Sequence, residues 1–152
     1  MDWVWLSLQD SSFAQYVRNS VWLYPTANIL HVLMVMTFFS LVAAMDLSLL
    51  RALGSAPAKV VIARLRPWAF VALIAIAATG SVLLAPEAVP LAGNLAFQVK
   101  LAAITLALAN VGLNEWAVRN MPDSAGLVRF SAAASLVIWL FVAAMGRSIA
   151  YV

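Results

Sequence analysis

Four long apolar stretches constrain this chain more than any other feature. They cover residues 26–50, 68–85, 95–118 and 130–151. A hydrocarbon core of about 30 Å needs roughly 20 mostly apolar helical residues to cross it, and each stretch is close to that length. Because 65% of the residues are hydrophobic and 10% are charged, little of the chain is left for a soluble domain. We therefore expect an all-α integral membrane four-helix bundle, with residues 1–152 as a single transmembrane domain.

The segment before the first stretch predicts a short helix along the membrane surface. Phe13 and Tyr16 lie one helical turn apart, after the pair Asp10-Ser11, whose side chains suit the start of a helix. Tryptophan and tyrosine residues flank this segment on both sides, and such rings favour the boundary between membrane and water. We expect an interfacial helix over about residues 10–20.

The basic residues predict the orientation of the chain. The loops at residues 51–66 and 119–129 carry Lys or Arg, whereas the loop at residues 86–94 carries neither. Short loops rich in Lys and Arg stay on the cytoplasmic side. The pattern predicts a multi-pass protein of a bacterial cytoplasmic (inner) membrane, with the N- and C-termini on the outer side.

A single histidine in the first apolar stretch is the most unusual residue of the chain. Ionisable side chains inside a membrane helix are costly and generally have a specific partner. At about 1.5 Å per residue, His31 lies roughly 9 Å below Pro25, and Lys100 of the third stretch has a similar depth. Asn28 precedes His31 by one turn on the same helix face. We therefore expect a polar site near the outer side, with His31, Lys100 and Asn28 as candidate cofactor-binding residues.

A second set of polar residues is expected in the bundle interior or in structural roles. Asp46 lies near the inner end of the first stretch, where an ion pair with Arg51 or Arg66 would stabilise the rim. Lys100, Asn110 and Asn114 share one helix face, which should point away from lipid, and such asparagines usually hydrogen-bond across helices. The full set is Asp46, Arg51, Arg66, Asn110, Asn114 and Glu115.

Several segments resemble an uncharacterised family of small bacterial four-helix membrane proteins. They are residues 13–25 (FAQYVRNSVWLYP), His31, residues 46–50 (DLSLL), 66–69 (RPWA), 79–80 (TG) and 94–100 (NLAFQVK), and Asn110. More distantly, a histidine in one span and a lysine early in another resemble the copper-resistance D proteins and the small membrane protoporphyrinogen oxidase. The resemblance to the latter implies that the bundle binds haem b, with His31 as ligand of the haem iron. Lys100 is the other residue of this sequence that matches a position of that family's site.

The chain departs from the usual haem pattern. Six-coordinate b-haem generally takes two histidines, and this chain has one. The nearest family often has a second histidine near the end of the third span, where this sequence reads Asn114-Glu115-Trp116. The alternatives are a five-coordinate haem, a Met or Lys second ligand, a site shared across a homodimer, or no haem and no other cofactor.

Three functions remain open at this point. The first is a haem protein that transfers electrons near the outer face, and the second is a non-enzymatic accessory or structural subunit of a larger membrane complex or homo-oligomer. The third is a carrier of small solutes or ions along the polar face of the third span. Whether the protein is an enzyme is left undecided, because no pairing of a nucleophile with a base is visible. The net charge of +3 is too small to indicate nucleic acid, so the expected surroundings are the lipid bilayer and other membrane proteins.

Overall fold

The computed structural model describes residues 2–52, 56–120 and 125–148, which are helical apart from short turns. This confirms the all-α prediction. The elements are α1 (Asp2–Gln9), α2 (Ser12–Asn19), α3 (Leu23–Ala52), α4 (Ala56–Leu84), the 3₁₀ helix η1 (Ala85–Glu87), α5 (Ala88–Gly93), α6 (Leu95–Asn120) and α7 (Ala125–Ser148).

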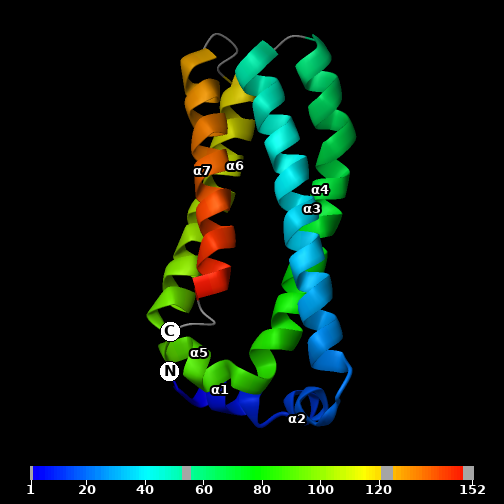
Figure 1. Cartoon of the computed structure of the whole chain (residues 1–152). Coiled ribbons are helices and arrows are strands. Elements are labelled where there is room, and N and C mark those ends of the chain that lie inside the picture. Colours follow the sequence, from blue (N-terminus) through cyan, green and yellow to red (C-terminus); the bar gives the residue numbers. More distant parts are fainter. Residues whose placement is uncertain (1, 53–55, 121–124, 149–152) are drawn as a thin grey trace.

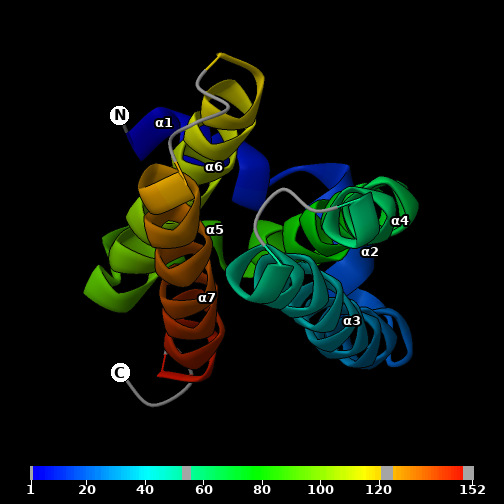
Figure 2. The ribbon, with the colours of Figure 1, turned by 90° about the horizontal axis from the view of Figure 1, so that it is seen from above.

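Four helices, α3, α4, α6 and α7, are long and apolar enough to cross a membrane. They form two antiparallel hairpins, α3 with α4 and α6 with α7 (Figure 1). Seen along the bundle, α7 of one hairpin packs against α3 of the other (Figure 2). We call this contact the α3–α7 seam. Within each helix the backbone N–H and C=O groups hydrogen-bond to one another. This suits a chain in lipid, where no water is available to form those hydrogen bonds.

The largest apolar cluster lies along the α3–α7 seam. Phe38 of α3 meets Trp139 of α7 edge to face, with ring centroids 4.6 Å apart and planes at 76°. Val42 and Val142 continue this contact on either helix. Buried alanines complete the cluster and let the helices approach closely. They are Ala69, Ala72, Ala103 and Ala107.

The short helices α1, α2, η1 and α5 form a layer across one end of the bundle (Figure 1). A helix is present at the predicted place as α2, and Ser11 caps it by accepting the Ala14 N–H at 3.2 Å. The chain also forms α1 before it. The loop expected at residues 86–94 was wrong in part, because most of it folds into η1 and α5.

Hydrogen bonds hold this layer together across long distances in sequence. The Arg18 guanidinium donates to the Pro86 carbonyl at 3.1 Å and to the Gln9 carbonyl at 3.3 Å. The Gln9 side chain accepts the Val89 N–H at 3.0 Å. Together these bonds join α1 and α2 to the connection between the two hairpins.

Two of the predicted span boundaries differ from the observed helices. The second helix begins at Ala56 rather than near residue 68, and the fourth begins at Ala125 rather than near residue 130. Pro57 lies in the first turn of α4, where its missing N–H costs nothing, and the helix continues through Pro67. Membrane helices tolerate such prolines because neighbouring groups satisfy the freed carbonyl. The basic segment read as a loop is therefore mostly the first part of α4.

Candidate functional site

His31 is held against α4 by a hydrogen bond to Thr79. Its Nδ1 lies 2.9 Å from the Thr79 hydroxyl oxygen. While the Thr79 hydroxyl donates its single hydrogen to the Ala75 carbonyl at 2.7 Å, it can only accept from His31. In that arrangement the hydrogen of the neutral imidazole is on Nδ1. The other ring nitrogen, Nε2, keeps its lone pair.

A glycine makes room for this imidazole. A Cβ at Gly80 would lie 3.3 Å from His31 Cε1, which is closer than most real Cβ contacts, and 3.7 Å from Nδ1. The Ile76 carbonyl, one turn earlier, also interacts with the ring. Residues 76–80 of α4 thus form a contact surface on which the half-buried His31 ring lies directly against the helix backbone.

Lys100 packs against a glycine in a similar way on the other hairpin. It is partly buried on α6, and its Nζ lies 3.4 Å from the position that a Cβ of Gly146 in α7 would take. Its charge acts electrostatically on His31 across the two hairpins. Asn28, in contrast, is exposed on α3. The structure therefore brings His31 and Lys100 to one end of the bundle and leaves Asn28 outside their contacts.

The polar residues at the opposite end do not pair as expected. Arg66 of α4 forms its ion pair with Glu115 of α6, at 2.7 Å between Nη2 and Oε2. Asp46 is buried and hydrogen-bonds the Ser135 side chain of α7. The expected ion pair of Asp46 with Arg51 or Arg66 was wrong, because helix rotation points Arg66 toward α6 and Arg51 is exposed.

Asn110 binds across the second hairpin, as predicted for an asparagine inside a span. Its side-chain amide donates to the Ser131 carbonyl of α7 at 2.9 Å, and the Ser131 hydroxyl donates to Asn110 Oδ1 at 3.1 Å. Ser131 is completely buried, whereas Asn114 is only partly buried on α6. These bonds lock α6 against α7.

Sequence reasoning missed the residues that receive these contacts. Thr79 and Gly80 entered only as part of a resemblance, and Ser131 and Ser135 were not singled out. A readable signal was present, because Ser131, Ser135 and Trp139 follow one another at steps of four residues and so mark one face of the last span.

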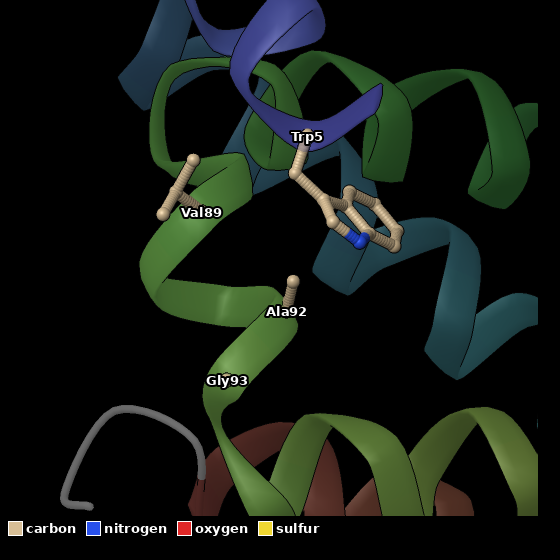
Figure 3. Close-up of a pocket in the computed structure, with 4 residues that line it drawn as sticks. All are labelled: Trp5, Val89, Ala92 and Gly93. Carbon is tan, nitrogen blue, oxygen red and sulfur yellow. The ribbon is translucent and has the colours of Figure 1, made fainter. Parts of the chain in front are cut away.

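A small cavity lies at the same end of the bundle as His31 and Lys100. It has a volume of about 220 Å³ and is lined by Trp5 of α1 and by Val89, Ala92 and Gly93 of α5 (Figure 3). The Trp5 ring reaches from the surface layer toward Ala92. The cavity is smaller than typical cofactor pockets of about 300–1,000 Å³, so it would take a small apolar group at most.

The described residues contain no group of three or more His, Cys, Asp or Glu side chains that could hold a metal ion. A haem would need fewer protein ligands, and the His31 imidazole is a residue type that could hold one. Metal-bound imidazoles generally donate their second N–H to a fixed partner, which Thr79 is here.

Comparison with known proteins places the chain in a family. The model of a family of unknown function (DUF6644) matches residues 5–152. The chain belongs to this family. No curated protein and no solved structure matches it. Membership of DUF6644 assigns the chain to a family but not to a function, so the function is inferred from the residues.

Proposed function

We propose that this DUF6644 protein is a membrane haem protein that transfers electrons, in which His31 would hold the haem iron and Lys100 would lie beside it. The observation that carries the proposal is the hydrogen bond from His31 Nδ1 to Thr79, at 2.9 Å. With the Thr79 hydroxyl donating to Ala75, this bond leaves Nε2 as the nitrogen with a free lone pair, and imidazole is a common haem ligand. A haem bound there would supply one-electron redox chemistry.

Lys100 gives the site a positive charge for an acidic group. Its amine comes from the α6–α7 hairpin, whereas His31 comes from the α3–α4 hairpin. Charge-assisted hydrogen bonds to carboxylates are about twice as strong as neutral ones, so Lys100 suits a haem propionate. The ligand would then bridge the two hairpins at the end covered by α1, α2 and α5.

We also propose that the protein lies in a bacterial inner membrane, and the distribution of basic residues supports an orientation with this site toward the outer side. The ends of α3 and α6 and the starts of α4 and α7 share the end opposite the surface layer (Figure 1). Exposed basic residues at that end include Arg51, Lys59 and Arg64. Since basic residues stay cytoplasmic, the end with α1, α2 and α5 would be the outer one.

Absorption spectra of the protein purified from haem-replete cells test the proposal. We expect a Soret band in the wild type that is absent in His31→Ala and retained in the matched control Thr105→Ala. Thr105 is exposed, and its hydroxyl bonds to Leu101 within α6. Lys100→Met should keep the band but lower the haem content. A folded, colourless wild type would overturn haem binding and favour an accessory or structural subunit of a complex or homo-oligomer.

A further inference from the structure

Asp46 is a buried acid that the proposed haem site does not use. It is 7% exposed and lies on the α3–α7 seam, where it hydrogen-bonds the Ser135 side chain. Its Oδ2 atom is buried and has no hydrogen-bond partner among the described residues. An acidic side chain with an open oxygen inside a membrane bundle calls for a physical explanation.

Apolar clusters lie on both sides of Asp46 along the seam. One helical turn in one direction, Val42 and Trp139 belong to the large apolar cluster. One turn in the other direction, Leu49 packs with Val128 and Ala132 in a second cluster. Apolar side chains thus pack against the seam on both sides of the carboxyl group.

Among the described residues, no ion pair joins Asp46 to a basic residue of the neighbouring helices. On α3 itself Arg51 is exposed, and on α7 Arg129 is exposed. On α4, Arg66 is engaged by Glu115 of α6. A buried carboxylate without a cation is far more costly than a buried neutral acid, because the neutral form forfeits at most one hydrogen bond.

Trp139 adds a second unpaired polar group to the same seam. It lies one turn from Ser135 on the same face of α7, and its ring contacts Phe38, two turns before Asp46 on α3. Its indole Nε1 is buried without a partner among the described residues. The seam thus buries an unpaired donor as well as an acid with an unpaired oxygen, and both would gain hydrogen bonds to water if the seam opened.

We propose that Asp46 is a proton-binding site: the carboxyl group is neutral while α3 and α7 are packed, and it ionises only when the seam opens. Ionisation moves the proton from Oδ2 to water that enters between the hairpins. The negative charge left behind is then held by Ser135 and the entering water. Protonation and the packing of the two hairpins are thereby coupled.

Infrared spectroscopy of the purified protein tests the protonation state directly. At neutral pH we expect a carboxylic-acid C=O band that shifts in D₂O, is lost in Asp46→Asn and is retained in Glu115→Gln, the matched control. A wild type without this band, or its persistence in Asp46→Asn, would overturn the proposal. The result is independent of haem, because neither His31 nor Lys100 takes part.

Two further measurements keep the proposal testable if Asp46→Asn fails to fold. Ser135→Ala retains the acid but removes its hydrogen bond, so the band should move to higher frequency, and an unchanged band would count against Asp46 as its source. When the pH is raised, the band should disappear together with a change in tryptophan fluorescence. That fluorescence change should be absent in Trp139→Phe. Loss of the band with unchanged Trp139 emission would disprove coupling to the seam.

Discussion

Replacing Asn110 with alanine should weaken the bundle by an amount that the contacts allow us to work out. The substitution removes the amide bond to the Ser131 carbonyl, at 2.9 Å, and the bond that Asn110 Oδ1 accepts from the Ser131 hydroxyl, at 3.1 Å. Interhelical hydrogen bonds in membrane proteins average about 0.6 kcal/mol and reach about 1.7 kcal/mol. For two bonds we expect the free energy of unfolding to fall by about 1–2 kcal/mol, roughly a 5- to 30-fold change in the folding equilibrium.

The order of the variants is as informative as the magnitude. Ser131→Ala removes only the hydroxyl bond, because the amide of Asn110 still reaches the Ser131 backbone carbonyl. It should therefore cost less than Asn110→Ala, and the double variant should cost less than the sum of the two. Thr105→Ala is the control, since its hydroxyl bonds to Leu101 in its own helix and faces outward. A change within about 0.5 kcal/mol is expected there.

Reversible unfolding in mixed micelles, followed by circular dichroism or by steric trapping, gives these free energies. The reasoning fails if Asn110→Ala is no more destabilising than Thr105→Ala. It also fails if Ser131→Ala costs more than Asn110→Ala. In that case the hydrogen bond from the Asn110 amide to the Ser131 carbonyl would contribute nothing.

Three other outcomes follow from the contacts. In ¹⁵N NMR, the single histidine should show the Nδ1–H tautomer, and Thr79→Val should convert it to a mixture; a spectrum unaffected by the substitution would contradict the assigned hydrogen bond. Arg66→Ala should lower stability by at most about 1 kcal/mol, an effect that high salt removes, because the ion pair is partly exposed. Trp139→Ala should cost about 3–5 kcal/mol in chemical unfolding, and Trp139→Phe clearly less, since phenylalanine retains an aromatic ring against Phe38; equal costs would argue against the ring contact.

The helical architecture could be predicted from the sequence because lipid leaves few alternatives. Apolar runs of the right length have to satisfy their own backbone groups, so they become spanning helices. Counting residues from the ends of the spans also placed His31 and Lys100 at the same end of the bundle. That inference needs only the rise per residue and the alternation of direction, both of which are fixed by the backbone.

The side-chain partners could not be predicted in the same way. They depend on the rotation of each helix about its axis, and spans that are apolar nearly all round give little indication of that rotation. Asp46 was assigned to a basic residue because opposite charges attract, but the seam places it against Ser135. The early start of α4 was hidden for a related reason, since basic residues on a helix that extends beyond the membrane resemble a loop.

The contacts also suggest why a ligand would strengthen this bundle. The His31–Thr79 bond lies within the α3–α4 hairpin, and the Lys100–Gly146 contact lies within the α6–α7 hairpin. Each half of the candidate site therefore lies within one hairpin, and the hairpins meet chiefly along the α3–α7 seam. A ligand held by both His31 and Lys100 would bind only the assembled bundle, so mass action would stabilise the seam in proportion to ligand concentration. Because Asp46 lies on that seam, ligand binding would favour its packed, neutral state, and a ligand would raise the pH needed to ionise it.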